Sequence, residues 1–224
     1  MKEIQISTVV SWFEMFLQVL KKGRLITMAD NTKVASFGVS NFEYGIVADE
    51  FVKTTRKMSG LKEVKIELTN DLKTLAADNT AYLVLSGGIT EAKETINIYD
   101  IDSKMKQDLY GIQVKKGAEI YSKGITPNYV ATLFRTEMSN GKHTWVGMLK
   151  GMFSLPDFTS KTQDGAPDPD AAEVVGNFVA RGTEETILLI GREDNKDFDF
   201  DTFHKAVFQT SQSDVDALLN AVKA

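Results

Sequence analysis

The sequence has no cysteine, only two histidines and only four prolines in 224 residues. Without cysteine the chain has no disulfide framework, no Cys-ligated zinc site and no thiol nucleophile. Two histidines are too few for a His-ligated zinc centre unless carboxylates complete it. HExxH, GxSxG, P-loop and GxGxxG motifs are also missing, so the common hydrolase, nucleotide and dinucleotide sites have no starting point. We expect a protein that is not an enzyme and needs no cofactor or metal.

Positive charge is scarce relative to negative charge. The chain has 26 Lys and Arg against 31 Asp and Glu, a formal net charge of −5. A net-negative protein does not present a general phosphate-neutralising surface, so ordinary nucleic-acid binding is disfavoured. The remaining composition, 42% hydrophobic and 25% charged with 16 glycines, is that of a folded protein with many turns.

A hydrophobic run long enough for a membrane span is missing from the N-terminal segment. The apolar stretch at residues 9–20 is short and interrupted by Glu14 and Gln18, and its basic residues follow it, which is the wrong order for a signal peptide. Residues 1–27 are therefore either an N-terminal amphipathic helix or a non-native leader translated upstream of a natural start at Met28. An intact mass of the native protein distinguishes the two. Residues 28–224 are expected to form a single domain.

The first half of that domain reads as strands separated by turns. Residues 34–47 are rich in β-branched and aromatic side chains, and residues 63–69 alternate strictly. A turn is expected at Gly87-Gly88, followed by a strand at residues 95–99. In the strand at 63–69 the alternation predicts that three side chains point inward: Val64, Ile66 and Leu68.

A helix and a hairpin follow. Residues 103–109 predict a short helix with Asp102 or Ser103 as its N-cap and Gly111 as its stop. The apolar runs 129–138 and 143–153 flank Ser139-Asn140-Gly141-Lys142. Because Asn-Gly tolerates positive φ at both central positions, we expect a β-hairpin with a type I′ turn and long arms.

The C-terminal third begins with a loop. Residues 155–170 hold three of the four prolines without a hydrophobic period, which predicts a long exposed loop. Strands are expected at 173–181 and 184–191, joined by a tight turn containing Gly182. Asp201 is expected to cap a short helix that ends at Phe208, and Ser213 to cap a last helix. The fold class is mainly β.

Several residue clusters suggest chemistry, but packing explains them better. The acidic run from Glu193 to Asp201 suggests calcium, yet an EF-hand aligned at Asp197 places Thr202 and Phe208 where glycine and glutamate belong. A solvated surface is therefore favoured. His143 is expected to be exposed and His204 to be a packing or surface residue, while a glycosidase-type carboxylate pair stays open. Five aromatic residues are expected to pack in the core rather than bind ligands: Trp145, Phe198, Phe200, Phe203 and Phe208.

The order of these pieces resembles a known family. The resemblance lies in the segments FGVSNFEYG (37–45), AADN (76–79), LYG (109–111), YVATLFR (129–135) and GNFVARG (176–182). The hairpin, the loop and the aromatic C-terminal segment belong to it as well. In this order, the pieces are similar to those of the major tail (tail tube) proteins of long, non-contractile-tailed phages of Gram-positive bacteria. The resemblance spans nearly all of the chain after Met28. No single motif is diagnostic, and residues 1–27 depart from the pattern.

The resemblance implies a structural subunit of the virion tail, made in the host bacterial cytoplasm. Its fold would be a β-sandwich with a flanking helix and a long protruding hairpin. Copies would close into rings, expected to be hexameric, that stack into a tube for genome delivery. The expected partners are further copies of the chain, the tape-measure, tail terminator and baseplate proteins, and double-stranded DNA that passes through the lumen without specific binding. No membrane partner is expected.

Contacts between subunits or rings are expected at two exposed segments. One is the hairpin tip, with Ser139, Asn140, Gly141 and Lys142, and the other is the loop, with Leu155, Asp157, Phe158, Asp164 and Asp168. We expect the lumen to be net negative, because a basic lining would bind DNA tightly. The same fold in a tail-like bacteriocin stays open. The alternative function is a monomeric β-sandwich module that binds carbohydrate or another ligand, with an exposed Trp145.

Overall fold

The structure is a computed structural model that describes residues 34–77, 79–158, 162, 170–211 and 213–214. The chain divides into two units, Met1–Val34 and Ala35–Ala224, and the fold below is that of the second. The leader or helix expected at residues 1–27, Asp164, Asp168 and most of the helix expected after Ser213 lie outside the described residues.

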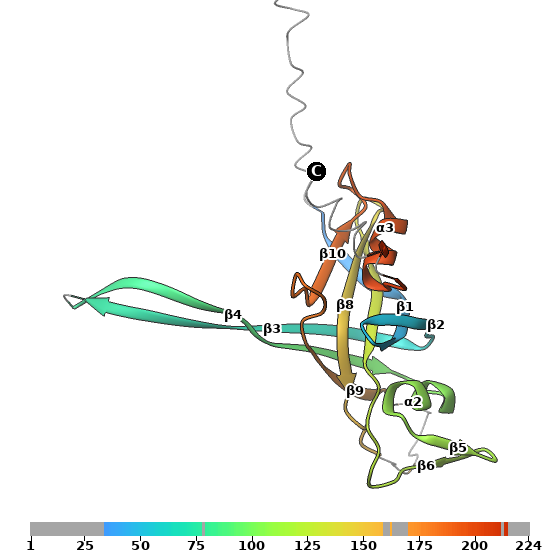
Figure 1. Cartoon of the computed structure of the whole chain (residues 1–224). Helices are drawn as coiled ribbons and strands as arrows, with labels where there is room; N and C mark the ends of the chain where they lie inside the picture. Colours follow the sequence, from blue (N-terminus) through green and yellow to red (C-terminus); the bar gives the residue numbers. More distant parts are fainter. Residues whose placement is uncertain (1–33, 78, 159–161, 163–169, 212, 215–224) are drawn as a thin grey trace, which may run out of the picture. The chain divides into compact units, whose positions relative to one another are not determined.

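Antiparallel strands dominate the second unit, which confirms the mainly-β class (Figure 1). An eight-stranded sheet has the order β2-β1-β7-β8-β9-β4-β3, with β10 also paired to β8, and β5 and β6 form a separate pair. The strands are β1 (Ser36–Ala48), β2 (Phe51–Lys57), β3 (Leu61–Ala77), β4 (Thr80–Ile98), β5 (Gln113–Lys115), β6 (Ala118–Ile120), β7 (Val130–Met138), β8 (His143–Phe153), β9 (Ala172–Phe178) and β10 (Leu188–Arg192).

The sheet folds over on itself. Thr132 in β7 donates a hydrogen bond of 2.7 Å to Glu94 in β4, although two strands separate β4 from β7 in the sheet order. The β9-β4-β3 half therefore faces the β1-β7-β8 half across a buried interior, as the two layers of a sandwich do. The two layers that the resemblance implies are joined into one sheet, because β8 pairs with β9 between them.

Both faces of the central hairpin β7–β8 are buried. Val130 and Phe134 belong to the core between the two halves of the sheet, and Ala131 and Leu133 belong to a second core on the opposite face. The helix α2 (Ser103–Tyr110) supplies Met105, Leu109 and Tyr110 to the first core, and the second core lies under α3 (Phe200–Val207). Burial on both faces explains why these strands read as nearly continuous apolar runs.

The caps of α2 confirm one prediction, and those of α3 correct another. Asp102 accepts a hydrogen bond of 2.6 Å from the Met105 N–H, and α2 stops at Gly111 with φ 68°. α3 is capped by Asp199, which accepts a bond of 2.8 Å from the Thr202 N–H, so the expected Asp201 cap is wrong. Asp199 has the extended backbone of an N-cap, whereas Asp201 already lies in the first turn.

The β7–β8 hairpin is confirmed, but its turn differs from the prediction. Gly141 has φ 77°, whereas Asn140 keeps a negative φ, so the turn is not type I′. The Gly141 N–H donates to Met138 O at 2.9 Å and the Met138 N–H donates to Lys142 O at 2.8 Å. Ser139, Asn140 and Gly141 therefore form a three-residue loop between the hydrogen-bonded residues Met138 and Lys142, and only Gly141 has a left-handed backbone. The Asn140 side chain accepts from the Lys142 N–H at 3.1 Å, which uses its amide without a strained backbone.

The strands on either side of Gly182 do not form the hairpin that the sequence suggests. A turn is present, closed by an Arg181 N–H bond of 2.9 Å to Thr186 O, but β9 and β10 do not pair with each other. Both pair with β8: β9 at Gly151–Phe153 and β10 at Thr144–Met148. The long strand β8 thus offers one edge to two short strands in succession, a non-local pairing that local turn chemistry cannot predict.

Candidate assembly surface

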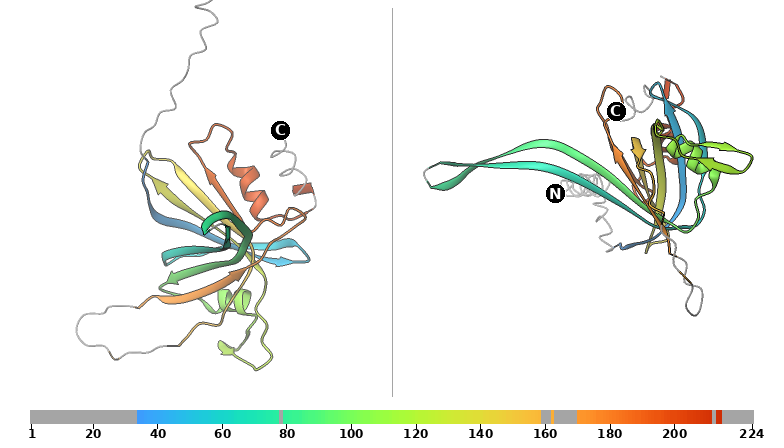
Figure 2. Two further views of the ribbon diagram at one scale, coloured as in Figure 1. Left: turned by 90° about the vertical axis from the view of Figure 1, so that its left-hand side faces the viewer. Right: turned by 90° about the horizontal axis from the view of Figure 1, so that it is seen from below.

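A two-stranded arm extends from the sheet. β3 and β4 pair from Leu61↔Ile98 to Ala77↔Thr80, but β9 accompanies β4 only from Ala92 to Ile98. Residues 69–91, here called the arm, therefore have no other strand beside them among the described residues, and Figures 1 and 2 show the arm leaving the sheet. Every described side chain of the arm is exposed.

The turn predicted at Gly87-Gly88 is wrong, because both glycines lie within β4. The strand partners shift between Thr69 and Leu72, which places extra residues of β4 opposite β3 at this point. Gly88 has φ 77°, so the pair forms a bulge rather than a chain reversal. The reversal lies beyond Ala77, where Asn79 has φ 63°.

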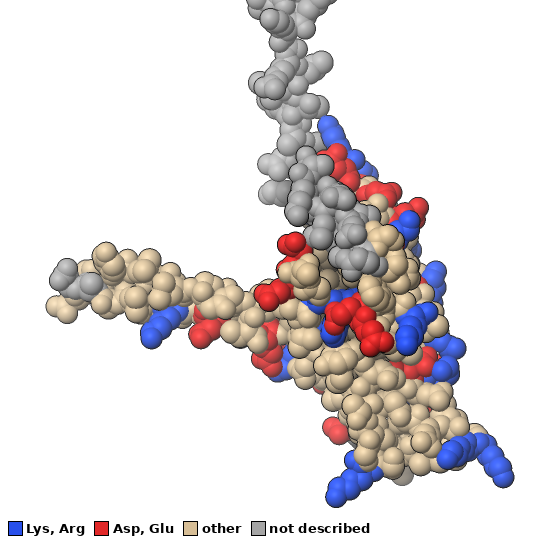
Figure 3. All heavy atoms as spheres, in the orientation of Figure 1, with Lys and Arg blue, Asp and Glu red and all other residues tan. Residues whose placement is uncertain are grey.

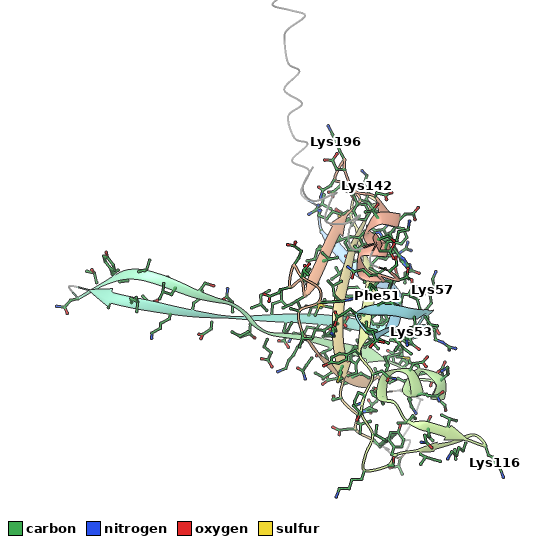
Figure 4. The ribbon with its side chains drawn as sticks, viewed as in Figure 1. Phe51, Lys53, Lys57, Lys116, Lys142 and Lys196 are labelled. Carbon is green, nitrogen blue, oxygen red and sulfur yellow. The ribbon has the colours of Figure 1, made fainter. Side chains whose placement is uncertain are left out.

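Apolar side chains occupy both faces of the arm. Residues directly opposite in an antiparallel pair share a face, so Leu75 and Leu83 lie on one face while Thr74 and Val84 lie on the other. Leu72 is 61% exposed and Tyr82 is 76% exposed. The space-filling view in Figure 3 shows the arm mostly without charge, and the sticks in Figure 4 extend from both sides of its ribbon. A hairpin in a soluble monomer normally keeps a polar face, so this surface indicates a partner.

A groove of about 580 Å³ lies where the arm meets the sheet. Its apolar lining includes Leu68 just before the arm, Ile89 near the base of the arm, Ile187 just before β10 and Leu188 within β10. Glu184 and Glu185 from the Gly182 turn add acidic side chains to the lining. We call this feature the arm-base groove.

The strand predicted at residues 63–69 continues into the arm. Val64 and Ile66 pack against the first core, as predicted. Leu68 shares their face in the strand register, as predicted, but its side chain is 42% exposed. It lies at the end of the covered part of the sheet, opposite Ala92, where the core no longer shields it.

The outer face of the β9-β4-β3 half is acidic. The strand register places four glutamates on the face opposite to the buried Ile96 and Val174: Glu63, Glu67, Glu91 and Glu173. Lys65 and Lys93 lie on the same outer face as these glutamates. Lys65 and Lys93 form ion pairs of 2.7 and 2.8 Å with Glu67 and Glu91, which leaves an excess of acids on this face.

The predicted hairpin tip is exposed but is held to neighbouring segments. Ser139, Asn140, Gly141 and Lys142 are all exposed. The Ser139 N–H donates to Ala35 O at 2.8 Å, and the Lys142 ammonium lies 3.3 Å from Glu193 O. The protruding hairpin implied by the resemblance is therefore not this one, because β7–β8 lies in the middle of the sheet and β3–β4 forms the arm.

The described part of the predicted loop is also exposed. Leu155 and Asp157 face solvent, and Phe158 is 72% exposed with its ring edge-on to Tyr121 at 5.6 Å. The loop follows the end of β8, whereas the hairpin tip precedes its beginning. The eleven residues of β8 separate them by about 35 Å of extended chain. The two predicted contact regions thus lie at opposite ends of the sheet and do not form one site.

The polar residues near the hairpin tip form a structural cluster. Glu193 accepts hydrogen bonds from the His143 ring and from the Trp145 indole, both at 2.8 Å. Burial opposes ionisation of Glu193, but these bonds outweigh it and lower its pKa. His143 is therefore half-buried, not exposed as predicted. Trp145 is 5% exposed and packs on Phe200, which confirms its core role and removes the exposed tryptophan that the carbohydrate-binding alternative requires.

The remaining candidate ligands are used internally. His204 lies 3.3 Å from the buried Glu43 carboxylate and packs on Phe208, and the hydrogen bond from His204 lowers the pKa of Glu43. Asp194 pairs with Arg192 at 2.7 Å and Asp199 caps α3. In the part of the chain that the structure describes, no group of three acidic or histidine side chains is arranged to hold a metal ion.

Two buried ionisable side chains, Glu94 and Arg181, form hydrogen bonds that link separate segments of the chain. Glu94 is fully buried, and burial raises its pKa to about 8. Its second oxygen, Oε1, has no hydrogen-bond partner. Arg181 is also buried and donates to the carbonyl oxygens of Glu50, Leu149 and Val207. Burial lowers the pKa of its guanidinium.

Sequence reasoning missed the arm, which is the main feature of this surface. A signal was present: Asp78 and Asn79 are turn-forming residues between two apolar segments of similar length. The adjacent glycines at 87 and 88 gave the stronger turn signal and obscured it.

No helix among the described residues is long and apolar enough to cross a membrane.

The likeness of this chain to known proteins is structural. No family model matches the sequence, and no curated protein matches it. The structure is similar to a chain in the cryo-EM structure of the anti-feeding prophage (AFP) baseplate, 6-fold symmetrised, with 6% sequence identity and a TM-score of 0.37. The alignment covers 71% of this chain and 94% of that chain. At this TM-score the likeness carries no argument about function.

Proposed function

We propose that the chain is a structural subunit of a phage tail tube, which polymerises as stacked rings to form a conduit for the genome. The observation that carries the proposal is the arm, whose two faces both expose large apolar side chains. Covering each such side chain contributes roughly 1–2 kcal/mol. Several of them together favour association strongly, so a second polypeptide on the arm is the simplest way to stabilise it.

Other features support a polymer rather than a single pair of molecules. The hairpin tip and the loop lie at opposite ends of β8, as contacts between successive rings would. The arm and the rest of the sheet are different surfaces, so docking of one on the other is heterologous and can repeat from copy to copy. The resemblance of the sequence to tail tube proteins supplies the expected six-fold closure and the expected tape-measure, terminator and baseplate partners.

Assembly of the purified full-length protein tests the proposal. We expect rings or tubes by negative-stain electron microscopy at high protein concentration, or when a tail initiator is added. In a variant with residues 71–88 replaced by Asn-Gly, the paired residues Asn70 and Ile89 would flank a two-residue turn. This variant should stay folded and monomeric.

A matched control separates the arm from exposed apolar residues in general. Tyr99 is 49% exposed and follows β4 at the end of the strand opposite to the arm, so Tyr99→Thr should leave assembly intact. The proposal fails if the unmodified protein stays monomeric under all these conditions. It also fails if the shortened variant assembles as well as the unmodified protein.

A further inference from the structure

We propose that the arm-base groove and the adjoining edge of β10 receive the arm of a second copy of this chain. The inference rests on the proposed function and names the receptor surface that it requires. The groove is lined by apolar side chains and two glutamates, the edge of β10 has open main-chain groups, and the arm exposes apolar side chains on both faces.

The edge of β10 has main-chain groups that are available for pairing. Ile187 O accepts from the Leu149 N–H at 3.0 Å, and the Glu193 N–H donates to His143 O at 3.0 Å. In an antiparallel pair these bonds recur at every second residue, so Leu188 and Ile190 direct their N–H and C=O groups away from β8. Within the described residues no strand pairs with this edge, and the Ile190 side chain is 61% exposed. An open edge of this kind accepts a strand from another chain.

The side chains of the groove match those of the arm. The groove is lined by Leu68, Ile89, Ile187 and Leu188, and the arm carries Leu75, Leu83 and Leu85 on one face. Lys73 is opposite Leu85 and so lies on that same face. It is the basic residue of the arm, while Glu184 and Glu185 line the groove. Apolar contact combined with opposite charges fixes the register of such a contact.

The occupant must be another molecule's arm. Leu68 and Ile89 of a chain line its own groove, and beyond them β3 and β4 remain paired as far as Ala77↔Thr80. A chain's arm therefore starts at its own groove and cannot fold back into it while this pairing lasts. Each copy offers the apolar face around Leu75 and Leu83 farther along its arm and a groove at the base of the arm, so copies can join head to tail.

Because the chain has no cysteine, introduced cysteines report on this contact directly. We would mix Lys73→Cys protein with Glu185→Cys protein under assembly conditions and add a short bis-maleimide cross-linker. The expected result is a covalent dimer containing both variants. The double variant Lys73→Cys/Glu185→Cys should give a ladder of higher oligomers. In the matched control, Glu185→Cys is replaced by Glu63→Cys, which lies on the outer sheet face and should cross-link at a background rate.

Charge reversal gives an independent measurement. Lys73→Glu alone, or Glu184→Lys/Glu185→Lys alone, should raise the protein concentration needed for assembly roughly three- to tenfold, and combining them should restore it. Thermal unfolding should not change, because all three side chains are exposed. If the unmodified protein assembles but these variants neither cross-link above the control nor alter assembly, the groove is not the receptor while the proposed function stands. If the unmodified protein never assembles, both proposals are overturned.

Discussion

The buried carboxyl of Glu94 gives the chain a pH dependence that can be measured at a single residue. Its folded-state pKa is about 8, against an ordinary value of 4.5, because burial disfavours the ionised form. The folded state therefore keeps a proton that the unfolded state has lost. This contribution to the free energy of unfolding is largest below about pH 4.5 and falls by at most about 1.4 kcal/mol per pH unit until about pH 8.

The substitution Glu94→Gln should remove this slope. The amide keeps the shape of the protonated carboxyl but does not titrate, so urea unfolding at about pH 5, 7 and 9 should show a much flatter profile. Glu63→Gln is the control, because Glu63 is exposed on the outer sheet face and should leave the slope unchanged. An unaltered slope in Glu94→Gln would show that Glu94 does not titrate in this range.

Single-residue patterns could be predicted where burial follows local alternation. Val64 and Ile66 are assigned to packing correctly because apolar and polar residues alternate around them, and Trp145 because it lies in a nearly continuous apolar run. Leu68 continues the same alternation but is exposed, because its position depends on where β9 stops covering the sheet. The half-burial of His143 depends on Glu193, a residue fifty positions away. Neither fact is encoded within a few residues of the side chain concerned.

At the level of elements, the loop at residues 155–170 should be dispensable for folding and needed for assembly. It connects β8 to β9, whose ends already adjoin, since the Ser154 N–H bonds to Val175 O at 2.8 Å. A short Gly-Ser linker can therefore replace it with little loss of stability. We expect a folded monomer with an unchanged circular dichroism spectrum that does not form tubes. Normal tubes from this variant would show that ring contacts do not use the loop.

Elements with a local signature could be predicted, and those defined by distant pairing could not. The helix α2 has its cap and its stop within ten residues of sequence, and the β7–β8 hairpin has its turn between two apolar runs. β9 and β10 pair with β8 rather than with each other, a choice made by the interior of the whole sheet. The arm was missed for a related reason: a strand is recognised by periodicity, and periodicity does not say whether anything covers it.

At the scale of the whole molecule, the acidic outer face of the β9-β4-β3 half is the surface that we expect to line the lumen. Duplex DNA carries about one negative charge per 1.7 Å of helix axis. A lining with an excess of acids repels it weakly along the whole tube, so the genome can slide without being held. Ion pairing already occupies Lys65 and Lys93 on this face, which leaves the DNA with few free cations to contact.

Reversing this charge should convert a passive conduit into one that binds DNA. In the variant Glu63→Lys/Glu67→Lys/Glu173→Lys the face becomes basic, and the three positions are exposed, so folding and tube formation should persist. Assembled tubes of the variant should retain short duplex DNA at low salt and release it as salt rises, with a slope set by the number of phosphates contacted. Tubes with the corresponding glutamines should retain little. If the lysine tubes bind DNA no better than unmodified tubes, this face does not line the lumen, and the conduit must be formed by another surface of the sheet.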